Sequence, residues 1–237
     1  MRRLKDKLAV ITGGSKGIGK AIATALGREG CRIVITARHV GDLQKAAREL
    51  TRLDIQVLTI KTDVRKLKDV EALVARVEDK LGSPHILVNN AGIGRFGEVI
   101  NMKEEDFCAT LETNLFGVFY CTRTFLPGMI AQKEGHIVNI SSLAGKNTFA
   151  GGSAYCASKH GLIAFSECLM MEVRQHNIKV TTVCPGTVQT GFSPRTKEQT
   201  WALTAEDVAK SVVDVVTSSP GSIVSMVDLR PLQPPRR

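Results

Sequence analysis

The chain has 237 residues, of which 43% are hydrophobic and 23% are charged, a mix that excludes intrinsic disorder as the overall state. No apolar run approaches the roughly 18 residues of a membrane span, and the basic segment Met1–Leu8 lacks the apolar core of a secretory signal. The net charge is +9, yet no element carries the basic stripe with interleaved aromatics that nucleic-acid binding requires. We therefore expect one soluble domain, residues 1–237, that binds neither membrane nor nucleic acid.

Short apolar segments alternate with longer segments of helical period along the whole chain. Strands are predicted at Leu8–Thr12, Arg32–Ala37, Gln56–Ile60, His85–Asn89, His136–Ser141, Lys179–Cys184 and Ser222–Val227. Helices are predicted at Gly17–Glu29, Asp42–Leu53, Leu67–Leu81, Lys103–Ala131, Ser153–His176 and Ala205–Ser218. The strand segments are almost entirely apolar, which is typical of a sheet covered on both faces.

Strands that alternate with helices of this length must lie parallel, because each helix returns the chain to the same end of the sheet. The pattern predicts a doubly wound, Rossmann-type α/β fold, with a seven-stranded, mostly parallel sheet and helices on both faces. The Pro/Arg-rich tail, residues 230–237, is predicted to be irregular.

The six cysteines show neither a C-x-x-C pair nor a Cys/His cluster with zinc-ligand spacing. We therefore predict no metal site. Disulfides are not expected in a chain with a core this large, so the cysteines are interpreted as buried free thiols in a reducing cytoplasm.

A glycine-rich loop follows the first predicted strand and opens the first predicted helix. Glycines permit a tight turn and a close approach of backbone to a pyrophosphate, and the helix N-terminus adds N–H groups and a positive dipole end. The spacing G-x-x-x-G-x-G differs from the G-x-G-x-x-G fingerprint, and a plain structural turn is the alternative. The strand–turn–helix context favours a dinucleotide site formed by Gly13, Ser15, Lys16, Gly17, Ile18 and Gly19.

The residues beside the predicted ribose position are basic. NAD-binding proteins of this fold place an acidic residue at the end of the second strand, where it accepts from the ribose 2′-OH. Here Ala37 stands at that position, Arg38 follows it, and Lys16 lies in the glycine loop. Two cations favour a 2′-phosphate, so NADP(H) is the predicted cofactor, with solvated surface charges as the alternative.

Five motifs in this order resemble the short-chain dehydrogenase/reductase family in its compact single-domain form. They are Thr12–Gly19, Asp63–Val64, Asn89–Gly92, Asn114, and Ser142 with Tyr155–Lys159. The resemblance covers about Leu8 to Val227, and it is greatest to the 3-oxoacyl-[acyl-carrier-protein] reductases.

The resemblance implies a role for each matching position in cofactor binding. It places Asp63 and Val64 at the adenine. It places Asn89, Ala91 and Gly92 near the cofactor ribose. Around the nicotinamide it places Pro185, Gly186, Val188 and Thr190.

The predicted catalytic centre is Tyr155 with Lys159, which are four residues apart in a helix and so share a face. Free tyrosine has a pKa of about 10, and a neighbouring ammonium is expected to lower it. Ser142, at the end of the fifth predicted strand, is expected to donate a hydrogen bond to a substrate carbonyl. The resemblance implies that Asn114 is the fourth catalytic residue and supports a water chain from Lys159, which also holds the cofactor ribose.

The predicted substrate loops are residues 93–97, 143–150 and 191–205. Their apolar side chains are Phe96, Leu143, Phe149, Phe192 and Trp201, and their candidate anion-binding residues are Arg95, Lys146 and Arg195. The preferred hypothesis is an NADPH-dependent reductase of 3-oxoacyl thioesters, with acyl carrier protein as a candidate partner. The alternatives are a reductase or dehydrogenase for another small carbonyl or secondary alcohol (a sugar, steroid or pterin), or a non-catalytic NADP-binding regulator. A homodimer or homotetramer is expected, paired through the helices at 103–131 and 153–176.

Overall fold

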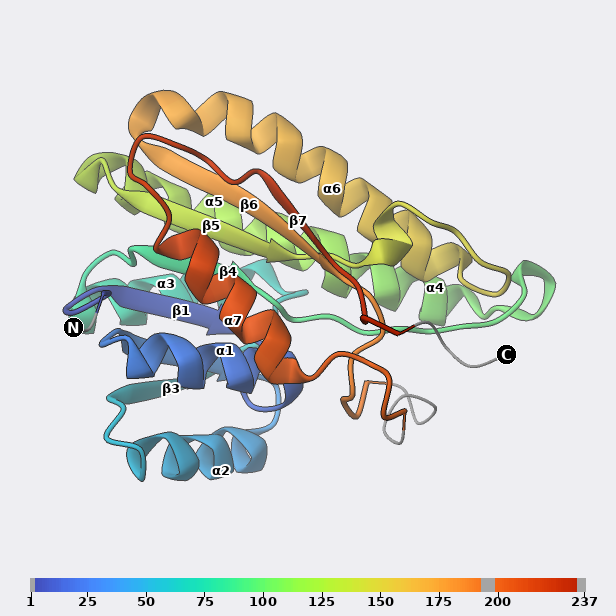
Figure 1. The fold of residues 1–237 in the computed structure, drawn as a ribbon, viewed down its shortest axis with the longest axis horizontal. Helices are drawn as coiled ribbons and strands as arrows, with labels where there is room; N and C mark the ends of the chain where they lie inside the picture. The colour runs from blue at the N-terminus through green and yellow to red at the C-terminus, as the bar shows by residue number, and fades with distance from the viewer. Residues whose placement is uncertain (1–2, 193–198, 234–237) are drawn as a thin grey trace.

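In the part of the chain that the computed structural model describes, residues 3–192 and 199–233, one sheet of seven parallel strands forms the centre of the protein (Figure 1). The strands are β1 (Leu8–Thr12), β2 (Arg32–Ala37), β3 (Val57–Lys61), β4 (Ile86–Asn89), β5 (Gly135–Ile140), β6 (Ile178–Pro185) and β7 (Met226–Leu229). Their order is β3-β2-β1-β4-β5-β6-β7. The predicted fold class is confirmed.

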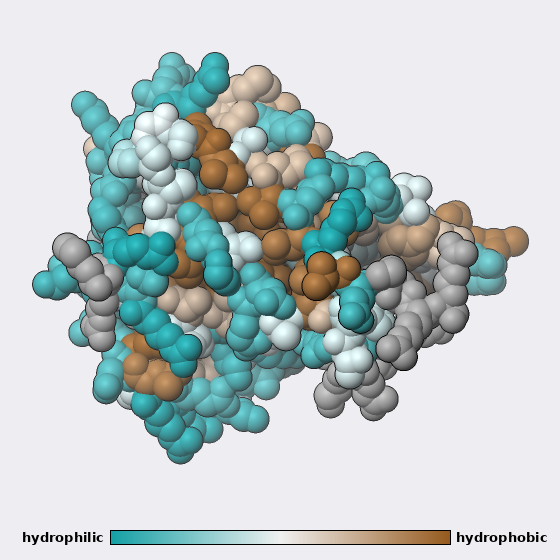
Figure 2. Space-filling model, viewed as in Figure 1, coloured by the Kyte–Doolittle hydropathy of each residue, from teal (hydrophilic) through white to brown (hydrophobic). Residues whose placement is uncertain are grey.

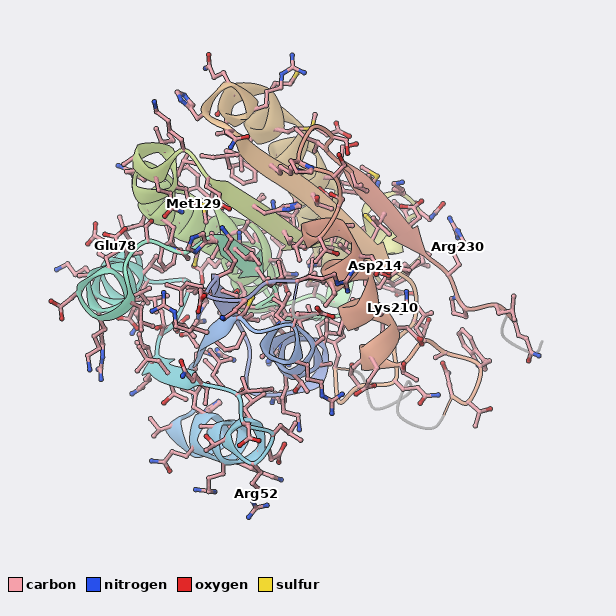
Figure 3. The ribbon with its side chains drawn as sticks, turned by 60° about the vertical axis from the view of Figure 1, so that its left-hand side comes forward. Arg52, Glu78, Met129, Lys210, Asp214 and Arg230 are labelled. Carbon is pink, nitrogen blue, oxygen red and sulfur yellow. The ribbon has the colours of Figure 1, made fainter. Side chains whose placement is uncertain are left out.

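Helices cover both faces of the sheet. They are α1 (Gly17–Arg28), α2 (Val40–Thr51), α3 (Leu67–Leu81), α4 (Glu104–Leu111), α5 (Gly117–Gln132), α6 (Ser153–Val173) and α7 (Ala205–Val216). Buried side chains of α1, α2 and α7 share one apolar core, and those of α3, α5 and α6 share the other. Polar helix residues lie on the outside, as with the Lys210–Asp214 ion pair on α7 (2.8 Å; Figure 3).

The apolar strand segments follow from this double coverage. In β1, Leu8 and Val10 pack into the core of α3, α5 and α6, whereas Ala9 and Ile11 pack into the core of α1, α2 and α7. Successive side chains of a strand point to opposite faces, so a strand buried on both sides needs apolar residues at every position. At the sheet edge β7 is only partly buried, and hydrophobic side chains are visible between α6 and α7 in Figure 2.

The predicted bounds of the fourth helix and of the last strand were wrong. The predicted helix Lys103–Ala131 consists of α4, a π-helical segment (Glu112–Phe116) and α5. The last strand runs over Met226–Leu229 instead of Ser222–Val227, because residues 226–229 pair in register with 182–185 of β6. The other elements differ from the predictions by a few residues at their ends, where helices fray and assignments vary.

The cysteine prediction also needs correction. Four cysteines are buried free thiols, but Cys108 on α4 and Cys168 on α6 are exposed. Among the described residues no group of His, Cys, Asp and Glu side chains is arranged to hold a metal ion. None of the described helices is both long enough and apolar enough to cross a membrane.

The strand order reverses direction between β1 and β4, which creates a crevice at their carboxyl ends. In doubly wound sheets this switch point is where ligands bind. The glycine loop follows β1, residues 90–92 follow β4, and both segments therefore meet at the crevice.

Candidate active site

A cavity of about 1620 Å³ opens at the carboxyl ends of the strands. It extends from the glycine loop past the loops that follow β4, β5 and β6, and it reaches residues 230–233 behind β7. Pockets for a single drug-sized ligand measure roughly 300–1,000 Å³, so this cavity has room for a dinucleotide and a second molecule.

The glycine loop forms one end of the cavity. Gly13 and Gly17 have φ angles of +64° and +53°, a region that side chains with a Cβ rarely occupy. Helix α1 begins at Gly17, and its cap residue Lys16 supplies no side-chain hydrogen bond to the first turn. Gly17 and Ile18 of that turn line the cavity at the positive end of the helix dipole, which suits an anion.

Asn90 holds the glycine loop in place, a role that the sequence analysis did not assign. Its side-chain amide donates to the carbonyl oxygens of Thr12 (2.9 Å) and Gly13 (3.2 Å). The Thr12 hydroxyl in turn accepts from the backbone N–H groups of Asn90 and Ala91, both at 3.0 Å. The two consecutive asparagines at the end of the fourth strand could have indicated this role, but only Asn89 was given a function from the sequence.

Two of the predicted cofactor residues lie behind the cavity wall. Asn89 is only 2% exposed, and its amide donates to Asn139 (2.9 Å) and Thr122 (3.2 Å) inside the protein. Gly19 is also buried, and a Cβ there would collide with the Gly13 carbonyl oxygen. The other predicted cofactor residues line the cavity: Gly13, Ser15, Lys16, Gly17, Ile18, Arg38, Asp63, Val64, Ala91, Gly92, Tyr155, Lys159, Pro185, Gly186, Val188 and Thr190.

The part of the cavity between the glycine loop and the end of β2 carries the two predicted cations. Lys16 and Arg38 are exposed and line the cavity, and neither forms an ion pair with any residue that the structure describes. Asp63 is paired with Arg65 (2.6 Å), which holds the pKa of its carboxyl below the usual range. Asp42, in the first turn of α2, is a second carboxylate on this wall.

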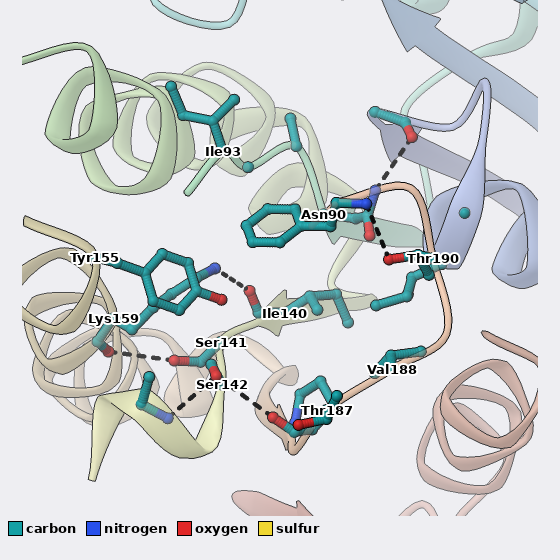
Figure 4. Close-up of a pocket in the computed structure, with 18 of the residues that line it drawn as sticks. Asn90, Ile93, Ile140, Ser141, Ser142, Tyr155, Lys159, Thr187, Val188 and Thr190 are labelled. Carbon is teal, nitrogen blue, oxygen red and sulfur yellow. Dashed lines mark hydrogen bonds between the residues drawn. The ribbon is translucent and has the colours of Figure 1, made fainter. Parts of the chain in front are cut away.

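Ser142, Tyr155 and Lys159 come together at the other end of the cavity (Figure 4). Tyr155 and Lys159 project from the first turns of α6, and the Lys159 ammonium lies 5.8 Å from the centroid of the Tyr155 ring. The ammonium donates to the Ile140 carbonyl (2.8 Å), and the Ser141 hydroxyl donates to the Lys159 carbonyl (3.2 Å). The Ser142 hydroxyl accepts from Ala144 N–H at 3.1 Å.

The direction of the Tyr155 pKa shift differs from the sequence prediction. Burial raises the pKa of Tyr155 to about 12, and a hydrogen bond with Ser142 opposes that shift. The predicted lowering by Lys159 does not offset this effect of burial, because the ammonium donates to Ile140 and lies 5.8 Å from the centroid of the ring. Burial also lowers the pKa of Lys159 to about 8, so Tyr155 is a neutral phenol and Lys159 is mostly charged near pH 7.

Asn114 lies in the π-helical segment and is fully buried, so it does not line the cavity. Its amide accepts from Ile93 N–H (2.8 Å) and donates to the Ile93 carbonyl (2.9 Å) and to Ser158 (3.0 Å). These bonds fix the loop after β4 against α6 at Ser158, the residue that precedes Lys159. A π-helical turn within an α-helix is frequently found at a functional site.

The loop after β6 and the chain behind β7 close the remaining side. Gly186 N–H donates to the Leu229 carbonyl (2.8 Å), which holds the two segments together. A Cβ at position 186 would approach Cδ of Pro231 to 3.2 Å. Arg230, Pro231, Leu232 and Gln233 line the cavity in an irregular conformation, as predicted for the part of the tail that is described.

All five predicted apolar wall residues, Phe96, Leu143, Phe149, Phe192 and Trp201, line the cavity. Two of the three predicted anion-binding cations are engaged in ion pairs. Arg95 is paired with Asp106 (3.3 Å) and Lys146 with Asp228 (2.7 Å), while Arg195 lies outside the described residues.

A doubly wound sheet with a glycine loop at its switch point, and a Ser–Tyr–Lys group at the other end of the same cavity, defines a class of dinucleotide-binding oxidoreductases. The family model for short chain dehydrogenases matches residues 7–201 of this sequence, and the chain belongs to the short-chain dehydrogenase/reductase family.

Relatives along most of the chain support this membership. A 3-oxoacyl-[acyl-carrier-protein] reductase of Homo sapiens is 38% identical over 82% of this chain and 81% of its own. A sepiapterin reductase of Chlorobaculum tepidum is 34% identical over 94% of this chain and 96% of its own. The crystal structure of a metagenomic short-chain oxidoreductase in complex with NADP is 37% identical, covers 98% of this chain and 100% of that one, and superposes with a TM-score of 0.88.

Proposed function

We propose that this protein is an NADPH-dependent reductase that converts a ketone to a secondary alcohol, with Tyr155 as the proton donor. The observation that carries the proposal is the meeting of Ser142, Tyr155 and Lys159 in one cavity with the glycine loop. A neutral phenol beside a buried ammonium is suited to give a proton to an oxygen on which negative charge develops.

The residues of the cavity fit NADP(H). The N–H groups at the start of α1 suit the pyrophosphate, and the positive φ angles of Gly13 and Gly17 keep side chains away from it. Lys16 and Arg38 suit a 2′-phosphate, because both are cations that no described carboxylate pairs. The relative with 37% identity was solved in complex with NADP, which supports the same choice here.

Bound NADPH supplies the hydride that forms the new C–H bond at the carbonyl carbon. Tyr155 donates its phenolic proton to the carbonyl oxygen as the C=O π bond breaks, and Ser142 donates a hydrogen bond to the same oxygen. Lys159 places its charge near the phenol and stabilises the phenolate left behind. We assign Asn114 as a positioning residue, which fixes Ile93 and Ser158 around this group.

Two substrate classes follow from the relatives. The human relative favours a 3-oxoacyl thioester, with acyl carrier protein as the partner. The Chlorobaculum relative, which matches more of the chain, favours a pterin that carries a carbonyl group.

The first experiment follows NADPH oxidation by absorbance with acetoacetyl thioester, a small diketone and NADH controls. Tyr155→Phe should abolish turnover while NADPH still quenches or shifts protein fluorescence, because the ring stays and only the proton is lost. Appreciable turnover by the variant would refute the assignment of the donor. NADPH binding with no turnover of any carbonyl by the unaltered protein would favour a non-catalytic regulator.

We further propose that two copies pair through α5 and α6. Phe116, at the end of the π-helical segment, Phe119 on α5 and Met171 on α6 are 49%, 40% and 58% exposed, and large exposed apolar side chains mark candidate contact surfaces. Analytical ultracentrifugation tests this, because a Phe119→Glu variant should sediment as a smaller species.

A further inference from the structure

Three phenylalanine rings are gathered around the proposed proton donor. The Phe96 ring lies edge-on to Tyr155 with centroids 5.5 Å apart, and the Phe192 ring lies 5.7 Å from Tyr155. The Phe149 ring lies 6.0 Å from Phe96. These distances fall in the range of attractive aromatic pairs, so the four rings form one cluster.

The three phenylalanines are exposed although they line the cavity. Phe96, Phe149 and Phe192 keep 50%, 49% and 45% of their surface accessible. They come from three separate loops, after β4, after β5 and after β6, which the fold brings to one place. Isolated exposed apolar side chains are ordinary, but a contiguous exposed cluster at the mouth of a site marks a surface that a ligand covers.

Glycine residues make room for the rings. A Cβ on Gly94 would lie 2.6 Å from Cζ of Phe96 and 2.8 Å from Cε1 of Phe192. A Cβ on Gly152 would lie 2.6 Å from Cε2 of Phe149. All three rings therefore pack directly against glycine backbone, and a side chain at Gly94 or Gly152 would displace them.

Two of the described cations near the cluster are already paired with carboxylates. Arg95 and Lys146, the cations nearest in sequence to Phe96 and Phe149, are held by Asp106 and Asp228. Lys159 is 5% exposed and donates to Ile140. Among the described residues, the rings that pack against Tyr155 are those of Phe96 and Phe192, so the surface beside the phenol is aromatic.

We propose that the preferred substrate is an uncharged ketone that carries an aromatic ring within one or two bonds of the carbonyl, and that the ring packs among Phe96, Phe149 and Phe192. This inference rests on the proposed reductase function and deepens it. A flat ring offers both face and edge to the three phenylalanines while the carbonyl stays at Tyr155. A saturated acyl chain has no such complementarity.

The test compares phenylacetone with cyclohexylacetone. In both ketones a methylene separates ring from carbonyl, so the intrinsic reactivity of the carbonyl is matched, and cyclohexyl buries at least as much apolar area. A merely apolar pocket would favour cyclohexylacetone or show no preference. An aromatic cluster should give a kcat/KM about three- to tenfold higher for phenylacetone.

Phe149→Leu, which keeps an apolar side chain on the surface, should bring the ratio of the two kcat/KM values close to one. Phe107→Leu is the control, because Phe107 on α4 is also an exposed phenylalanine (38%) but lies outside the cavity, and its ratio should stay that of the unaltered protein.

A binding measurement separates this inference from the reductase proposal. Trp201 is the single tryptophan of the chain and lines the cavity, so its fluorescence reports ligand binding without turnover. Tighter binding of phenylacetone than of cyclohexylacetone supports the aromatic site even if no ketone is reduced. Reduction of 2,3-butanedione with equal or reversed ring preference overturns the inference and leaves the reductase function standing.

Discussion

Replacing Gly19 by alanine tests whether the shape of the glycine loop, and not only its charge, creates the cofactor site. Gly19 lies in the first turn of α1, where helix propensity alone favours alanine by about 1 kcal/mol. A Cβ at this position would nevertheless collide with the Gly13 carbonyl oxygen and lie 2.5 Å from Nδ2 of Asn90. Neither atom is the free end of a flexible side chain, because both belong to the hydrogen-bonded brace between β1 and β4.

The steric cost should exceed the helical gain. Over-packing of this kind costs about 1–3 kcal/mol. Movement of Asn90 also weakens its bonds to Thr12 and Gly13, worth about 1 kcal/mol each. We therefore expect Gly19→Ala to lose about 2 kcal/mol of unfolding free energy and to bind NADPH about tenfold more weakly, or worse.

Urea unfolding followed by circular dichroism gives the stability, and fluorescence titration gives the NADPH affinity. Gly41→Ala controls for helix propensity, since Gly41 lies in the first turn of α2 and a Cβ there would meet nothing within 4 Å. Its stability should be unchanged or up to about 1 kcal/mol higher. A Gly19→Ala protein as stable as the unaltered one, with equal NADPH affinity, would refute the steric reasoning.

Other predictions concern charge and buried hydrogen bonds. Arg38→Asp should lower the preference for NADPH over NADH by about tenfold or more, measured as the ratio of kcat/KM values, because a charge-assisted bond to the 2′-phosphate is lost; an unchanged ratio would make Arg38 a surface charge only. Burial lowers the pKa of His136 from 6.5 to about 4. Between these two pH values the unfolded chain binds a proton that the folded protein does not, so the free energy of unfolding decreases as the pH is lowered. In urea titrations the free energy of unfolding should be about 3 kcal/mol lower at pH 4 than near pH 7 because of this one group. His136→Gln can still donate to Thr181 and should lack this part of the decrease. Asn114→Ala leaves Ile93 N–H without its partner and should lower kcat more than it raises KM; an effect confined to stability would deny it a positioning role.

The sequence was sufficient for the fold because local patterns and the global arrangement agree. Apolar runs at every position of a strand require burial on both faces, and strands joined by long helices must be parallel, so the sheet and its layers follow. The glycine loop and the Tyr155–Lys159 pair were also predictable, because each depends on spacing within one turn or one helix turn.

Predictions that depended on which way a side chain points were less successful. Asn89 and Asn90 are adjacent, and a shift of one residue along a strand reverses the face, so the pattern alone did not show that Asn90 is the residue at the cavity. Asn114 was placed in a regular helix, whereas the π-helical segment there turns its amide toward Ile93.

The electrostatics and the substrate surface were decided by tertiary structure. The spacing of Tyr155 and Lys159 predicted a lowered tyrosine pKa, but burial raises it, because desolvation depends on everything packed around the phenol and not on one neighbour. Arg95 and Lys146 looked available as anion-binding residues until the fold brought Asp106 and Asp228 to them. The cluster of Phe96, Phe149 and Phe192 likewise exists only because three loops, far apart in the chain, end at the same edge of one parallel sheet.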